Sequence, residues 1–188
     1  MRGALLVALG LTCVPAASNA GAQWLELPIS DVRVLSDGIG HVRILLGPGD
    51  LATLEGKFVE AALLTVPVDG EAFPRDLGLR VFPVTQAWEG GPVDWTTPWS
   101  EPGGDFDERR MCAEQVSAGR RSTALQVNVS PIIREMVHGS IESHGFLLGV
   151  ARHHGAGFDP EELARFGSME GLMLRVKVRQ GGRWERPD

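Results

Sequence analysis

Leu172-Met173-Leu174-Arg175-Val176-Lys177-Val178-Arg179 is the stretch that decides the fold of this 188-residue chain. Successive side chains of an extended strand point to opposite faces of a sheet. Four aliphatic side chains therefore share one face of this segment, and three cations share the other. A strand with one apolar and one charged face lies between a core and water, which is typical of antiparallel sheets.

The same two-residue period recurs earlier in the chain. It marks residues 42–46, 77–81 and 125–129, where apolar side chains alternate chiefly with polar residues or glycine. Two more segments, residues 58–68 and 146–151, are apolar on both faces, and we expect them to be central strands covered on both sides. The pattern predicts an all-β domain.

Helical signals are few. Residues 131–138 form the best candidate, with Ser130 as the expected N-cap, Pro131 in the first turn and Gly139 as the stop. A second short turn is expected over residues 160–165. Many short strands with one or two short helices predict an antiparallel β-sandwich.

The N-terminal segment is typical of a secretory signal peptide. Arg2 precedes the apolar run of residues 4–14, and small residues then lead to a cleavage site after Ala22 or, alternatively, Ala20. The apolar run is shorter than the roughly 20 residues that a membrane-spanning helix needs, which disfavours the alternative of a membrane anchor. We therefore expect a signal peptide over 1–22, one domain over 23–179 and a polar tail over 180–188.

Export predicts a secreted, periplasmic or cell-surface protein without a transmembrane segment in the mature chain. The net charge of −6 favours neither a nucleic-acid partner nor an anionic membrane surface. Removal of the signal peptide leaves Cys112 as the remaining cysteine of the sequence, so no internal disulfide is expected.

Tryptophan is concentrated between residues 88 and 99. The segment Trp88-Glu89-Gly90-Gly91-Pro92-Val93-Asp94-Trp95, followed by Trp99, resembles a stretch of the DNRLRE domain family of exported, mainly bacterial modules. Further pieces in the same order strengthen the resemblance: residues 59–64, 125–133, 144–148 and 171–176. The resemblance implies a jelly-roll-like sandwich, and some members of the family bind carbohydrate. The DNRLRE string itself is absent.

Two groups of residues are candidate ligand sites. Trp95 and Trp99 could stack on sugar rings, although aromatic side chains also serve as core; we expect Trp88 and Trp95 to be core and Trp99 to be the most exposed of the three. Arg175, Lys177 and Arg179 could hold carboxylates or sulfates of an acidic polysaccharide. The alternatives for this row are a solvated face or an edge strand protected against aggregation.

Acidic residues in a glycine-rich stretch are candidates for a structural calcium site. They are Asp105 and Asp107, with Glu101 and Glu108 nearby. Their spacing does not match an EF-hand, and a solvated loop is the alternative. No other cofactor is expected.

The sequence contains no catalytic fingerprint of the common kinds. We therefore predict a non-catalytic secreted module that binds polysaccharide or a cell-envelope component. The alternative is a structural or adhesive cell-surface protein that binds a protein partner. An unrecognised polysaccharide hydrolase or lyase stays open, because catalytic carboxylate pairs lie far apart in sequence.

Overall fold

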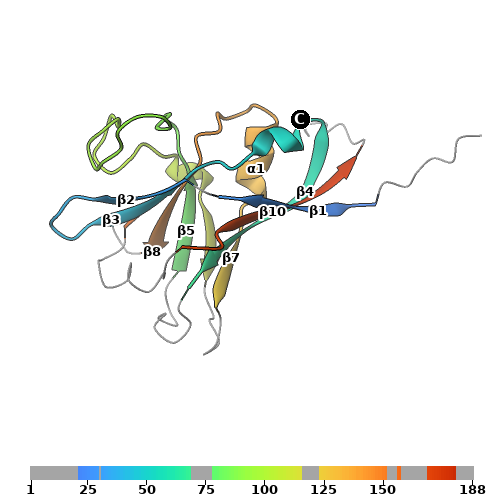
Figure 1. Cartoon of the computed structure of the whole chain (residues 1–188), viewed down its shortest axis with the longest axis horizontal. Helices are drawn as coiled ribbons and strands as arrows, with labels where there is room; N and C mark the ends of the chain where they lie inside the picture. Colours follow the sequence, from blue (N-terminus) through green and yellow to red (C-terminus); the bar gives the residue numbers. More distant parts are fainter. Residues whose placement is uncertain are drawn as a thin grey trace, which may run out of the picture.

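A computed structural model describes residues 21–29, 31–68, 78–115, 123–151, 156–157 and 169–180 (Figure 1). The strands are β1 (Gln23–Pro28), β2 (Val32–Ser36), β3 (Val42–Leu46), β4 (Lys57–Pro67), β5 (Gly78–Pro83), β6 (Cys112–Gln115), β7 (Ala124–Asn128), β8 (Phe146–Ala151), β9 (Ala156–Gly157) and β10 (Met173–Gln180). Helix α1 spans Ser130–Val137, and two short 3₁₀ helices span Leu51–Leu54 and Glu108–Arg110. The expected signal peptide up to residue 20, the turn at 160–165 and the tail beyond Gln180 lie outside the described residues.

Two antiparallel sheets form a sandwich. The four-stranded sheet has the order β1-β10-β4-β7, and the other has the order β2-β3-β8-β5-β6 with β9 beside β8. The chain passes from one sheet to the other after β1, β3, β4, β6, β7 and β9. The first and last strands, β1 and β10, pair with each other in the four-stranded sheet. This is the strand order of a jelly roll, and it confirms the sequence prediction of a jelly-roll-like sandwich.

The main core lies between the sheets. In β10, the predicted alternation is confirmed, because Leu174, Val176 and Val178 are buried while the intervening side chains reach the outer face. Leu125 and Val127 of β7 face the same core. Cys112 is a buried free thiol in this core, and burial raises its pKa. The described residues contain no helix with the length and apolar character that crossing a bilayer requires.

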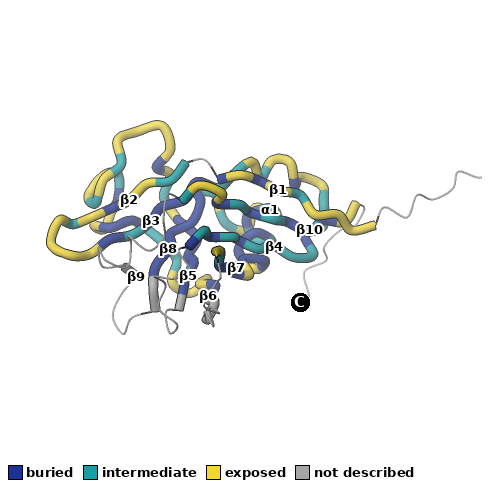
Figure 2. Tube along the Cα trace, turned by 60° about the horizontal axis from the view of Figure 1, so that its bottom comes forward, coloured by how far each residue is buried: buried dark blue, intermediate teal, exposed yellow. Residues whose placement is uncertain are grey.

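Strand β8 is buried on both faces, as predicted. Phe146 and Leu148 face the main core, while Leu147 packs into a second apolar cluster on the opposite face. The start of this strand is tightly packed against β3: Gly145 has a φ of +92°, and a Cβ built there would lie 2.1 Å from the Leu46 carbonyl oxygen. The strand order places β8 in the middle of the larger sheet, between β3 and β5 (Figure 2).

Strand β4 departs from the expectation of two fully covered faces. Val59, Ala62 and Leu64 are buried on one face, whereas the outer face is half-buried. The pairing with β10 shifts by one residue, because Lys177 lies opposite Ala61 and Val178 opposite Val59. Glu60 is therefore the extra residue of a β-bulge, which brings Val59 and Ala62 to the same face despite their spacing of three.

Helix α1 packs its buried stripe, Ile132, Ile133 and Met136, against the main core. Gly139 ends the helix with a φ of +68°, as predicted. The prediction that Ser130 caps the helix is wrong. The Ser130 hydroxyl is buried and accepts a hydrogen bond of 2.8 Å from the Ala62 N–H, so it anchors the helix start to β4 instead.

Candidate functional site

The tryptophan loop, residues 84–107, covers the outer face of the larger sheet. It appears in green above β2 and β3 (Figure 1). Its apolar side chains pack on residues that β2, β3, β5 and β8 direct away from the main core. This second cluster consists of Leu35, Leu45, Phe82, Val84, Trp88, Trp99 and Leu147, with Val93, Trp95 and Phe106 packed beside it. The tryptophan segment is therefore a second core.

The three tryptophans of the loop differ in burial. Trp88 and Trp99 are 3% and 7% exposed, and each indole N–H donates to a carbonyl oxygen, that of His144 for Trp88 and that of Asp94 for Trp99. Trp95 is half-buried. The expectation that Trp99 is the most exposed of the three is wrong, because its ring fills the space above Gly104 and β8.

Arg43 of β3 lies between two aromatic rings of the loop. Its guanidinium carbon is 5.3 Å from the centroid of Trp95 and 4.9 Å from that of Phe106, and its Nη1 donates to the Gly103 carbonyl oxygen at 2.6 Å. Partial burial lowers the pKa of Arg43, and the carboxylate of Glu108 opposes this shift. These contacts hold the loop against the sheet. The exposed part of the Trp95 ring therefore lies on a surface that the sheet supports from below.

The aspartates of the loop serve as turn caps. Asp105 accepts hydrogen bonds from the Ser100 N–H, the Ser100 hydroxyl and the Glu101 N–H, while Asp107 accepts from the Arg109 N–H and pairs with Arg110. Among the described residues, no group of three or more His, Cys, Asp or Glu side chains is arranged to hold a metal ion. Calcium binding stays a sequence prediction.

We expect the tryptophan loop to loosen in acid. Partial burial raises the pKa of Asp105, but the hydrogen bonds from Ser100 and Glu101 outweigh it and hold the pKa below the ordinary 3.8. A carboxyl group with a lowered folded-state pKa contributes stability at neutral pH, and this contribution is lost as the pH falls through the folded-state pKa. Below about pH 4, the fluorescence of the buried tryptophans should therefore shift to longer wavelength.

The variant Asp105→Asn provides the control. It should be less stable than the wild type at pH 7, and the difference between the two should shrink as the pH falls below about 4. A difference that stays constant between pH 7 and pH 2 would contradict this account of Asp105.

The cationic row lies on the outer face of the four-stranded sheet. Arg175 and Lys177 are half-buried, and Arg179 is exposed. Strand β10 has β1 on one side and β4 on the other, so the alternative that the row protects a sheet edge is wrong. The row and the tryptophan loop cover opposite outer faces of the sandwich, and the structure does not bring the two predicted sets of ligand residues together.

Each cation of the row has a partner on a neighbouring strand. Arg175 lies 3.4 Å from a carboxylate oxygen of Glu26, Lys177 lies 3.1 Å from Glu60, and Arg179 lies 3.7 Å from Glu60. Two of the cations also cover aromatic rings: Arg175 lies 5.2 Å from the centroid of Trp24, and Arg179 lies 5.2 Å from that of Phe58. We call this set the sheet-face site: Trp24, Glu26, Phe58, Glu60, Arg175, Lys177 and Arg179.

The sequence interpretation missed Trp24 and Phe58. Trp24 is 42% exposed on the edge strand β1, directly opposite Lys177 in the pairing register. The alternation of Trp24 and Glu26 with Leu25 and Leu27 was a readable signal of a strand with a polar outer face. The sequence did not indicate which strand this segment would pair with.

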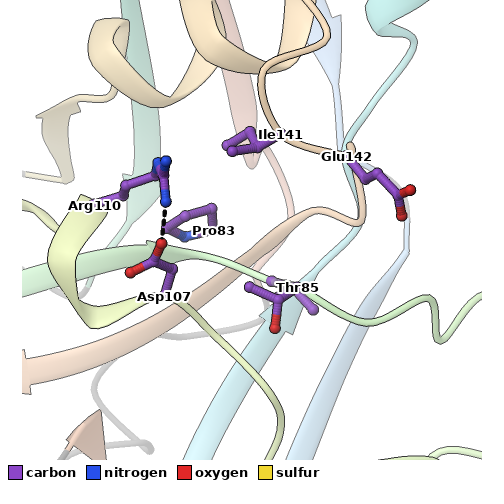
Figure 3. A pocket seen from close by; sticks show the side chains of 7 residues that line it. Pro83, Thr85, Asp107, Arg110, Ile141 and Glu142 are labelled. Carbon is purple, nitrogen blue, oxygen red and sulfur yellow. Dashed lines mark hydrogen bonds and ion pairs between the residues drawn. The ribbon is translucent and has the colours of Figure 1, made fainter.

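The described residues also line hollows elsewhere on the molecule. One has a volume of about 200 Å³ and is lined by Pro83, Thr85, Asp107, Arg110 and Ile141, among others (Figure 3). This volume is below the range of about 300–1,000 Å³ that is usual for small-molecule sites. Arg110 is already engaged there, because it pairs with Asp107 and with Glu135 of α1.

A larger hollow, of about 560 Å³, lies on the tryptophan loop. Its lining includes the carboxylates Glu101, Asp105 and Glu108 together with Phe106. A surface of this charge repels anions. The hollow therefore does not extend the anion-binding potential of the cationic row.

No protein-family model matches this chain, and no curated protein matches it either. The resemblance to the DNRLRE domain family stays a prediction.

Proposed function

We propose that the protein is an exported, non-catalytic β-sandwich module that binds an acidic polysaccharide or another anionic envelope polymer at the sheet-face site. The observation that carries the proposal is the row of three cations on a broad sheet face with aromatic rings beside them. Alternate residues of a strand are about 6.8 Å apart, so the row offers repeated positive charges along one line. A polymer with regularly spaced anionic groups matches such a line.

The chemistry of the site favours anions. Stacking on an aromatic ring uses the flat face of a guanidinium, so its terminal in-plane N–H groups can still donate to carboxylate or sulfate oxygens. In the ion pairs of this face, the three cations share two carboxylates, those of Glu26 and Glu60. This face therefore carries a local positive surplus in a chain whose net charge is −6.

One observation supports a non-catalytic role. Among the described residues, the aspartates whose pKa is displaced all have it lowered; they are Asp37, Asp94, Asp105 and Asp107. A glycosidase general acid needs the opposite shift, a raised pKa that keeps its proton near neutral pH.

The expected result is that the protein binds polygalacturonate or dextran sulfate and does not bind neutral dextran. In the double variant Arg175→Gln/Lys177→Gln, the affinity should fall at least about tenfold, because two charge-assisted contacts are lost. Added salt should weaken wild-type binding, since exposed charges are screened. Isothermal titration calorimetry at two salt concentrations measures both effects.

The double variant Arg33→Gln/Arg109→Gln is the matched control. It removes the same charge from exposed arginines outside the sheet-face site, and its affinity should stay within about twofold of the wild type. Equal losses in the two double variants would indicate a nonspecific charge effect. Failure of the wild type to bind either polyanion would refute the proposal and favour the alternative of a protein partner, for which the exposed apolar residues Val34 and Ile39 near the edge strand β2 are the best candidates.

A further inference from the structure

We propose that Glu60 is a built-in competitor of the ligand at the sheet-face site, so that the site accepts a polyanion and rejects isolated anions. The inference rests on the proposed function and adds a mechanism of selectivity to it. Glu60 bridges two of the three cations: its Oε2 lies 3.1 Å from Lys177 Nζ, and its Oε1 lies 3.7 Å from Arg179 Nε. Any anion that binds these two cations meets a carboxylate that already occupies them.

The bulge in β4 is what places this carboxylate. Glu60 is the extra residue between Val59 and Ala61, which lie opposite consecutive residues of β10. In a regular strand, Val59 and Ala61 would both face the core, and Glu60 alone would lie on the outer face. The bulge instead keeps both Glu60 and Ala61 off the buried face. The Glu60 side chain is three-quarters covered, which is unusual for a glutamate on an outer sheet face.

Helix α1 holds the bulge in this form. The Nε of Arg134 donates to the Val59 carbonyl oxygen at 2.9 Å, and its Nη2 donates to the Glu60 carbonyl oxygen. A bulge disrupts the ladder locally, and Arg134 supplies a charged donor to the carbonyl oxygens of Val59 and Glu60 at this point. Helix α1 therefore holds the backbone of Glu60 in place, and the Glu60 carboxylate lies beside Lys177 and Arg179.

The consequence concerns which anions bind. A single carboxylate or sulfate must displace Glu60 from Lys177 or Arg179 and gains little, since it replaces one anion by another. Arg175 pairs with Glu26, at 3.4 Å, and the Glu26 side chain is more exposed than that of Glu60. A polymer that displaces Glu26 from Arg175 secures one contact first, and the next contact is then intramolecular with a high effective concentration. The sheet-face site should thus distinguish a polymer from its monomer more sharply than an open row of cations would.

The variant Glu60→Gln tests the inference on the full chain. It removes the competing charge and keeps the size of the side chain. Its affinity for dextran sulfate should rise about three- to tenfold, the equivalent of two exposed ion pairs. It should also bind inorganic sulfate measurably, which the wild type should not. Calorimetric titrations with dextran sulfate and with inorganic sulfate measure the two effects.

Two controls exclude simpler explanations. Glu101→Gln removes one negative charge from the tryptophan loop on the opposite side of the sandwich, and it should leave the affinity within about twofold. Glu60→Asp keeps the charge and should not tighten binding. Thermal unfolding of each variant verifies that the fold is retained.

The outcomes separate the two proposals. If the wild type binds dextran sulfate and Glu60→Gln binds it with equal or lower affinity, Glu60 is not a competitor, although the site stands. If Glu60→Gln and Glu101→Gln tighten binding equally, the effect is one of net charge and the inference is again overturned. If neither wild type nor variant binds any polyanion, both proposals fall.

Discussion

Replacement of Gly145 by alanine is expected to lower the free energy of unfolding by about 4 kcal/mol or more, enough to unfold a domain of ordinary stability in large part. A Cβ at this position would lie 2.1 Å from the Leu46 carbonyl oxygen and 3.1 Å from two backbone carbon atoms. These atoms belong to the backbone, so no flexible side chain can move aside. The φ of +92° adds strain for any residue with a side chain.

The position of Gly145 means that the substitution should destabilise the whole domain. Gly145 leads into β8, which pairs with β3 and β5 and contributes to both apolar clusters. Its carbonyl oxygen accepts the Val84 N–H at 3.1 Å, where the tryptophan loop begins. A shift of the backbone here therefore disturbs the sheet pairing, the main core and the loop together.

Gly90→Ala is the matched control for this prediction. Gly90 also has a positive φ, +80°, but an added Cβ would meet nothing within 4 Å. It should cost about 1 kcal/mol, the strain of a left-handed conformation alone. Urea denaturation of both variants measures the difference, and similar costs for the two would contradict the role assigned to the contact with Leu46.

Replacement of Trp99 by alanine is expected to cost about 3–5 kcal/mol, the usual range for removal of a large buried aromatic side chain. Trp99 is 7% exposed and lies in the second cluster against β8. The loss also leaves the Asp94 carbonyl oxygen without the indole N–H that it accepts at 2.8 Å. The apolar contacts of the second cluster hold the loop on the sheet. In the variant, the loop should therefore detach from the sheet before the rest of the sandwich unfolds.

Two further variants locate the effect. Trp99→Phe keeps an aromatic ring without the N–H and should cost less than alanine. Trp24→Ala removes a tryptophan that is 42% exposed on β1 and should cost less than about 1.5 kcal/mol. Chemical denaturation monitored by circular dichroism gives the three values. If Trp24→Ala proved as costly as Trp99→Ala, the contrast drawn from burial would be wrong.

The alternation in β10 shows how far the sequence could be taken. Its buried Leu174, Val176 and Val178 follow from a period of two, because the pleat of a strand leaves no other arrangement. The bulge at Glu60 was not predictable, since both possible registers of β4 present apolar residues on each face. The partner strand decides between them, and partners are a property of the tertiary structure.

The candidate sites show the same limit. The row of Arg175, Lys177 and Arg179 was readable from one strand, but Glu26 and Glu60, which partly neutralise it, come from two other strands. The burial of Trp99 depends on a loop that folds back over a sheet, and loop paths leave no periodic signal in the sequence. Local patterns thus predicted the cations and could not predict their neighbours.

The antiparallel pairing of β1 with β10 has a consequence for how this sandwich can be joined to other molecules. Gln23 lies opposite Val178, so the chain enters and leaves the sheet at the same end, on neighbouring strands about 4.8 Å apart. A few residues of linker would connect the two ends. The sandwich can therefore be grafted as a single insert into a surface loop of a host protein, and its permutants can be opened at the β2–β3 hairpin while every strand keeps its partner.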